Sequence, residues 1–133
     1  MTRMEWYDSL WKPAWTPAPA TIGLIWQILY PVIVVSFGYV FVQAWRGRLP
    51  AATAWPFAVN LAANLAFTPI QFGLRNLWLA AFDIVLVWAS ILWMIGAAWP
   101  VARWVALAQA PYLVWVSIAT VLQLSVTWMN RGH

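Results

Sequence analysis

The chain has 133 residues, 65% of them hydrophobic and only 8% charged, and it carries a net charge of +4. Soluble domains average about 45–50% apolar and about 25% charged residues, so this composition excludes an ordinary soluble protein and predicts a single membrane domain over residues 1–133. The basic residues stand singly along the chain, which excludes a nucleic-acid-binding patch and favours contact with lipid headgroups. Because the sequence has no cysteine, disulfides, thiolate nucleophiles and sulfur-ligated metals are also excluded.

The first part of the chain, residues 1–20, is rich in proline and tryptophan. The stretch Glu5–Pro19 reads EWYDSLWKPAWTPAP, in which prolines stiffen the backbone and large rings offer apolar surface. Its acidic residues and prolines do not fit a cleaved signal peptide. We expect residues 1–20 to form a lid-like loop over a site for a flat apolar ligand, with Trp11 and Trp15 as lid residues. The alternative is that these two rings anchor the loop in the lipid headgroups.

Residues 21–133 are predicted to form an all-α bundle of transmembrane helices. A bilayer core about 30 Å thick requires about 20 helical residues, and four apolar segments meet this length: residues 21–44, 52–72, 77–99 and 105–129. Their continuous apolar runs lack the alternation that is typical of a transmembrane barrel. We expect Thr21 to cap the first helix, Pro31 to kink it, and Pro111 to kink the fourth.

Four spans place both termini on the same side of the membrane. The basic residues on that side are Arg3, Lys12, Arg75 and Arg131, against Arg46, Arg48 and Arg103 on the other. Basic residues are in excess on the cytoplasmic side of membrane proteins. The count of four against three therefore favours a multi-pass protein with cytoplasmic termini.

Polar side chains from every predicted helix fall at a similar depth, close to the proline-rich loop. Asp83 is the only ionisable residue well inside a segment, and a charge there is costly unless it has a partner or a wet cavity. The other members of this layer are Trp26, Tyr30, Asn64 and Gln123. We expect the layer to mark a site. Two alternatives stay open: Asp83 lies at the headgroup edge, and Asn64 joins Asn60 in hydrogen-bonding helices together.

The chain has thirteen tryptophans, and they call for two explanations. Those at segment ends, such as Trp45, Trp78 and Trp128, fit the aromatic belt found at membrane–water interfaces. Trp26 and Trp115 lie deeper, where an indole N–H requires a hydrogen-bond partner. These two are therefore candidates for ligand contact.

Residues suited to catalysis are scarce. The single histidine is His133, so no histidine-based triad or metal cluster can be assembled, and one intramembrane carboxylate does not supply an acid–base pair. We therefore predict no catalytic residue, no metal site and no required cofactor. The expected function is binding rather than chemistry, and the protein is not expected to be an enzyme.

Several motifs occur in order along almost the whole chain. They are Trp6-Tyr7, Leu10, Lys12-Pro13, Trp15 and Pro17 (WYxxLxKPxWxPP), then Trp26, Leu29 and Tyr30 (WxxLY), then Asn64–Gly73 (NLAFTPIQFG), Arg75, Asp83, Pro111–Leu113 with Trp115, and Ala119-Thr120. In this order the chain resembles the translocator protein family, also called tryptophan-rich sensory proteins or the TspO/MBR family.

The resemblance implies a membrane protein that binds porphyrins such as protoporphyrin or heme, with a regulatory or transport role. By position it implies a pocket with a lid around Trp15, and the polar layer adds Tyr30 to that pocket. The implied lining residues are Trp26, Asn64, Phe67, Asp83, Trp115, Ala119 and Leu122. Animal members also bind cholesterol and synthetic drugs. Photochemical porphyrin breakdown is associated with some members, at tryptophans that match Trp26 and Trp115, and ranks below binding.

The chain also departs from the family pattern. Phe67 stands in place of a tryptophan, Gln71 of a phenylalanine and Gln123 of an asparagine, and the sterol motif of the last helix lacks its tyrosine, which disfavours cholesterol. The usual first helix is not seen before the loop, so we expect the polar layer to be covered by a second copy in a homo-oligomer or by another subunit of a larger, pigment-bearing membrane complex. The alternative function is that of a structural accessory subunit in such a complex, with ligand binding lost.

Overall fold

The structure, a computed structural model, describes residue 6 and residues 9–130, and these residues form helices and turns without a strand. In chain order the elements are α2 (Pro19–Trp45), α3 (Ala51–Thr68), η1 (Pro69–Gly73), α4 (Leu77–Ala98), α5 (Arg103–Ala108) and α6 (Ala110–Met129). The predicted all-α class is confirmed. The assignment of residues 1–133 to one domain stays a prediction.

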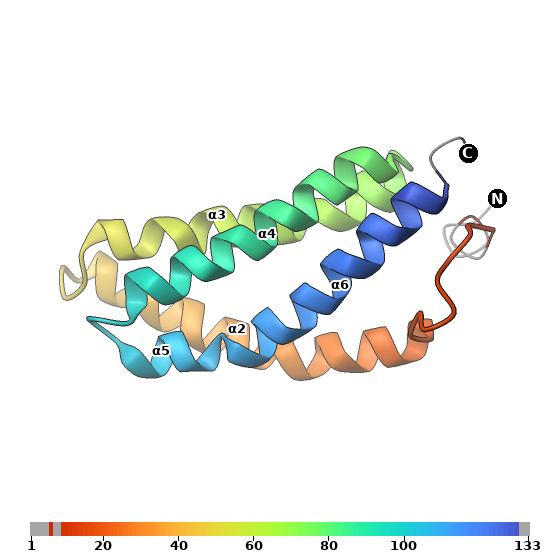
Figure 1. Cartoon of the computed structure of the whole chain (residues 1–133). Coiled ribbons are helices and arrows are strands. Elements are labelled where there is room, and N and C mark those ends of the chain that lie inside the picture. Colours follow the sequence, from red (N-terminus) through yellow and green to blue (C-terminus); the bar gives the residue numbers. More distant parts are fainter. Residues whose placement is uncertain (1–5, 7–8, 131–133) are drawn as a thin grey trace.

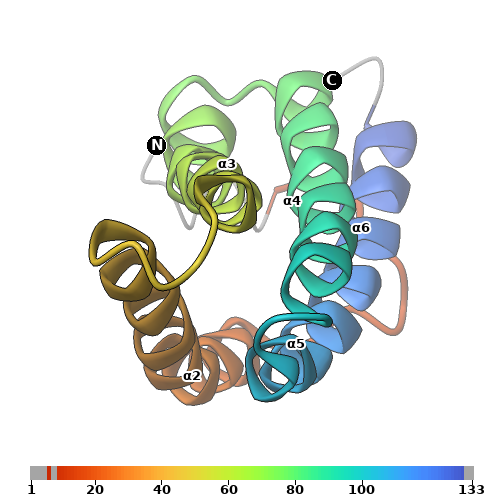
Figure 2. The ribbon, with the colours of Figure 1, turned by 90° about the vertical axis from the view of Figure 1, so that its left-hand side faces the viewer.

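Four helical rods surround a common centre (Figure 2): α2, α3 with η1, α4, and the pair formed by α5 and α6. The closest packing joins α3 to α4 and α4 to α6, whereas α2 contacts α3 and α5. Toward the end of the bundle where α6 ends, α2 and α6 diverge (Figure 1). This divergence separates the two rods that carry the deep tryptophans of the sequence.

Three of the rods are long and apolar enough to cross a membrane: α2, α4, and α5 together with α6. The rod of α3 is less apolar because it carries Asn60 and Asn64. Asn60 is buried, whereas Trp55 and Leu65 on the same helix are exposed, so the outer face of α3 still suits lipid. The chain is therefore an integral membrane protein. The side of the membrane on which its ends lie stays a prediction.

The helix ends correct two expectations about proline. The first helix begins at Pro19 with Ala18 as its N-cap, not at Thr21, because proline suits the first helical position, where no N–H partner is needed. The fourth predicted helix is broken rather than kinked: Gln109 separates α5 from α6, and Pro111 lies in the first turn of α6. Proline in a helix interior removes a hydrogen bond and clashes with the preceding turn. As expected, α2 continues through Pro31 and bends along its length (Figure 1).

A π-helical turn, η1, ends the α3 rod. It starts at Pro69, which has no N–H to continue the α-helical pattern. Arg75 then adopts a left-handed backbone with φ of 54°, and Asn76 caps α4 by accepting a hydrogen bond from the N–H of Leu79 at 2.9 Å. This tight connection sets the position of Gln71 at the end of the bundle.

Aromatic and polar contacts hold the second half of α2 in the bundle. Phe37 and Phe57 pack edge to face with ring centroids 5.1 Å apart. Nε2 of Gln109 donates to Oγ of Ser36 at 2.9 Å, and both side chains are fully buried. The first half of α2 makes no comparable hydrogen bond to another helix within the described residues, so it can stand away from α6.

Candidate ligand-binding site

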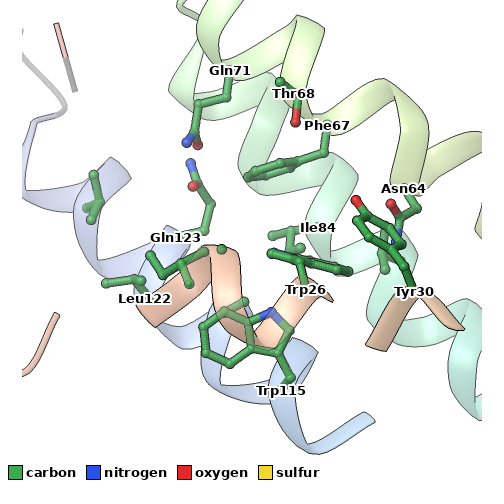
Figure 3. Close-up of a pocket in the computed structure, with 15 residues that line it drawn as sticks. Trp26, Tyr30, Asn64, Phe67, Thr68, Gln71, Ile84, Trp115, Leu122 and Gln123 are labelled. Atoms are coloured by element: carbon green, nitrogen blue, oxygen red, sulfur yellow. The ribbon is translucent and has the colours of Figure 1, made fainter. Parts of the chain in front are cut away.

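A cavity of about 380 Å³ lies between the diverging helices (Figure 3). Every rod of the bundle contributes to its wall. The lining residues are Ile22, Gly23, Trp26, Tyr30, Asn64, Phe67, Thr68, Gln71, Ile84, Val87, Trp115, Ala119, Leu122, Gln123 and Val126. Ligand pockets typically hold about 300–1,000 Å³ and are mostly apolar with a few polar groups, which is the character of this wall. All predicted pocket residues except Asp83 are brought together here.

Aromatic rings form one side of the cavity. Trp26 stacks on Tyr30, with centroids 5.3 Å apart and an interplanar angle of 28°, and meets Tyr112 edge to face at 6.3 Å. Trp115 is 93% buried, since its exposed fraction is 7%. Its indole Nε1 is buried without a hydrogen-bond partner among the described residues. Trp26 and Trp115, which the sequence places deep in their helices, therefore both lie on the cavity wall.

A buried hydrogen-bond network lies beside the cavity and includes the lining residue Asn64. Nδ2 of Asn64 donates to the hydroxyl of Tyr112 at 2.7 Å, and that hydroxyl donates to Oδ1 of Asn60 at 2.9 Å. Nδ2 of Asn60 donates to Oγ of Ser90 at 2.9 Å and to the carbonyl of Val87 at 3.2 Å. The two asparagines therefore differ in role: Asn60 joins α3 to α4 and α6, and Asn64 reaches the cavity.

Several lining residues are not among those predicted from the sequence. Thr68 and Gln71 follow Asn64 by four and seven residues, a spacing that places them on one face of a helix. Ile22 likewise precedes Trp26 by four. This spacing was the signal that could have found them. Gly23, Ile84, Val87 and Val126 carry no polar group, and no sequence signal distinguishes them from other apolar positions.

Asp83 is buried but lies outside the cavity lining. Its neighbour Ile84 and also Val87 face the cavity from the same helix. Oδ2 of Asp83 is buried without a hydrogen-bond partner among the described residues. Asp83 thus lies inside the bundle, one turn before the lining residue Val87, but it is not part of the cavity wall, and its predicted contact with a ligand stays a prediction.

The N-terminal strap, which we define as Trp6 and residues 9–18, is fastened to the end of the bundle. Trp6 and Leu10 are buried in a cluster with three residues of the helices, namely Leu77, Leu122 and Val126. Two members of this cluster, Leu122 and Val126, also line the cavity. The strap and the cavity therefore share a wall in α6.

The strap is also hydrogen-bonded to the end of α6. The N–H of Trp11 donates to Oδ1 of Asn130 at 2.9 Å, and Nδ2 of Asn130 donates to the Trp11 carbonyl at 2.8 Å. The Trp11 and Trp15 side chains are 69% and 50% exposed, and neither lines the cavity. These rings thus do not cover the site as expected of lid residues, because the strap is held by its backbone and by Trp6 and Leu10. Their exposure fits the headgroup alternative. Residues 1–5 and 7–8 of the predicted lid lie outside the described residues.

Replacing Asn130 by alanine is expected to release the strap. The substitution removes both hydrogen bonds to the Trp11 backbone, which together stabilise the attached state by about 1–3 kcal/mol. Hydrogen exchange at the Trp11 amide should accelerate about 5- to 150-fold. Ser125→Ala serves as the control, because among the described residues that hydroxyl bonds only to the Val121 carbonyl of its own helix. Equal exchange rates in both variants would show that Asn130 does not hold the strap.

The fold and this cavity define the class: a helical integral membrane protein with an aromatic-walled cavity between its helices. Within the described residues, no group of three or more His, Cys, Asp or Glu side chains is placed to hold a metal ion. The covering of the open face by a second copy or another subunit stays a prediction.

The chain belongs to the TspO/MBR family, whose model matches residues 1–129, and the family resemblance is thereby confirmed. It is 34% identical over 125 residues to the tryptophan-rich protein TspO of Bacillus cereus, covering 94% of this chain and 80% of that protein. It is 35% identical over 128 residues to protein CrtK of Rhodobacter capsulatus, covering 96% and 80%. It is 31% identical over 134 residues to the human translocator protein, covering 97% and 77%. These relatives are named as tryptophan-rich, translocator or Crt proteins rather than as enzymes.

Proposed function

We propose that this membrane protein binds a flat hydrophobic ligand such as a tetrapyrrole in the cavity between α2, α3, α4 and α6, with a regulatory or transport role. The observation that carries the proposal is the wall itself: Trp26 and Trp115, from two helices that diverge, both line one cavity of about 380 Å³. Indole rings offer broad apolar faces that stack on a planar ligand. The names of relatives, a tryptophan-rich sensory protein and translocator proteins, agree with a sensing or transport role.

The chemistry of the wall also favours binding over catalysis. Most lining side chains are aliphatic or aromatic, and all of them are uncharged. General acid–base catalysis is carried most often by histidine, carboxylate or lysine side chains, and the described residues that line the cavity include none of these. Such a wall supplies apolar contact and a few hydrogen bonds, which suits retention and release of an unchanged ligand.

Titration with protoporphyrin IX tests the proposal. In mild detergent, binding of the porphyrin should quench the tryptophan fluorescence of the protein and shift the porphyrin absorbance. Both changes should saturate and fit a single Kd. Trp115→Leu should weaken binding about tenfold, equivalent to about 1.4 kcal/mol, and Trp26→Leu should act in the same direction. Porphyrin absorbance is the readout for the variants, because the substitutions remove the fluorescent side chains themselves.

Trp55→Leu is the matched control, since Trp55 is 63% exposed on α3 and does not line the cavity. Its Kd should equal that of the unaltered protein. Absence of saturable binding to the unaltered protein would refute the function. Equally strong binding in all three variants would instead show that the porphyrin binds outside this cavity.

A further inference from the structure

The cavity has an amide-lined end that the proposed function does not explain. Gln71 of η1 and Gln123 of α6 are 5% and 6% exposed, and both line the cavity. Their side chains extend toward one another from opposite sides (Figure 3). Two neutral amides thus meet at the end of a cavity whose other walls are largely apolar.

These amides keep hydrogen-bonding capacity that the protein does not use. Oε1 of Gln71 is buried without a partner among the described residues. Nε2 of Gln123 donates to Oγ1 of Thr127 at 3.2 Å, which occupies one of the two hydrogens that a primary amide carries. Buried polar groups are nearly always hydrogen-bonded. An acceptor on Gln71 and a donor hydrogen on Gln123 are therefore available to a bound molecule.

No charged side chain lines this end of the cavity among the described residues. All lining side chains are neutral, and the guanidinium of Arg75 lies 6.0 Å from the ring centroid of Trp6, outside the lining. An ion buried without an opposite charge is strongly disfavoured in a low-dielectric site. An uncharged group that can both donate and accept hydrogen bonds is the match for two amides.

We infer that Gln71 and Gln123 form a specificity subsite for an uncharged ligand group that both donates and accepts hydrogen bonds, such as a primary carboxamide or a hydroxyl. This inference rests on the proposed function, because it assigns the polar end of the same ligand. A ligand that carries a carboxylate at this position is selected against, and one that carries an ester makes only half of the available hydrogen bonds.

Three porphyrins that share one macrocycle test the subsite: protoporphyrin IX, its dimethyl ester and its diamide. Binding is measured by absorbance at pH 8, where the free carboxyl groups are ionised. The diamide should bind the unaltered protein about tenfold more tightly than the dimethyl ester, the fold-change of one well-placed hydrogen bond. The dicarboxylate should bind no better than the ester.

Gln71→Met is the informative variant, because methionine has nearly the same shape and Oε1 of Gln71 has no partner to lose among the described residues. In this variant the diamide should lose its tenfold advantage, while the ester keeps its Kd. Gln27→Met, at an exposed position of α2 outside the lining, should change neither value. Gln123→Met provides a second variant with the same expected loss, should Gln71→Met fold poorly by circular dichroism.

The outcomes separate the subsite from the function. Equal binding of all three porphyrins, with no effect of either glutamine variant, overturns the subsite and leaves the cavity function standing. Tightest binding of the dicarboxylate also overturns it. Failure of the unaltered protein to bind any of the three refutes the proposed function and, with it, the subsite.

Discussion

Replacing Phe57 by alanine is expected to lower the free energy of unfolding by about 3 kcal/mol. Phe57 is fully buried on α3 and packs edge to face against Phe37 of α2. In a bilayer, helices associate through packing rather than through removal of apolar surface from water, so the transfer contribution known from soluble proteins is small. Two contributions to the loss of stability remain: the void that the truncation leaves and the lost contact between the rings of Phe37 and Phe57.

The magnitude follows from those two contributions. Truncating phenylalanine to alanine leaves a void on the order of 100 Å³ if the helices do not collapse, and such voids cost about 24 cal/mol per Å³. The aromatic pair adds about 0.5–1.5 kcal/mol. The void lies between α2 and α3, so part of the loss should appear as looser attachment of α2, the helix that carries Trp26 and Tyr30.

Unfolding in mixed detergent–SDS micelles, followed by circular dichroism, measures the effect. Phe82→Ala is the matched control, because Phe82 has the same side chain but is 72% exposed on the outer face of α4, where lipid or detergent replaces the lost ring. We expect that control to change the unfolding free energy by less than about 0.5 kcal/mol. Similar losses in both variants would mean that the Phe37–Phe57 contact does not hold α2.

Much of the fold could be predicted because the bilayer sets helix length. Four apolar segments were expected, and four rods were found with nearly the same bounds. The errors lie where proline acts through local geometry: a start at Pro19 in place of Thr21, and a break before Pro111. Composition reports where the apolar runs stop, but it does not report whether a helix continues through a proline, as at Pro31, or is interrupted beside one, as before Pro111.

The sequence predicts how deep the site residues lie in the bilayer better than it predicts which of them face the cavity. Trp26, Tyr30, Asn64 and Trp115 reach the cavity as expected, whereas Asp83 does not. In a membrane helix both the inner and the outer faces are apolar, so periodicity does not mark the inner face as it does in soluble bundles. Which buried residues of a helix line the cavity, as Ile84 and Val87 do and Asp83 does not, follows from packing between helices, which is a tertiary property.

The strap illustrates a second limit. The rings of Trp11 and Trp15 were expected over the cavity, and both are exposed. Their orientation depends on the hydrogen bonds between the Trp11 backbone and Asn130, which lies 119 residues further along the chain. A local motif of proline and tryptophan predicts a stiff loop, but contacts with distant residues, namely Asn130 and the cluster around Trp6 and Leu10, decide which of its residues face the bundle.

Replacing Asn60 by alanine is expected to lower the free energy of unfolding by about 2 kcal/mol, because it removes three interhelical hydrogen bonds. Such bonds contribute about 0.6 kcal/mol each on average in a membrane bundle and at most about 1.7 kcal/mol. Asn60 is 1% exposed, so no lipid or water replaces the lost partners. The hydroxyl of Tyr112 and Oγ of Ser90 each lose one partner.

Asn64→Ala is the comparison that separates stability from binding. Asn64 makes one of the network's hydrogen bonds, to Tyr112, and it lines the cavity. Its loss should cost about 0.6 kcal/mol of stability and weaken porphyrin binding, whereas Asn60→Ala should reduce stability more and binding less. Both unfolding and porphyrin titration are measured for each variant.

Tyr112→Phe identifies the coupling between the two asparagines, because it removes only the hydroxyl that joins them while the fully buried ring stays in place. If the hydroxyl transmits the position of Asn60 to Asn64, the binding losses of Tyr112→Phe and Asn64→Ala will not add in the double variant. Additive losses would instead mean that Asn64 is held by the packing of α3 alone. In the coupled case the buried network orients the cavity-facing amide, and the stability of the bundle and its choice of ligand depend on the same hydrogen bonds.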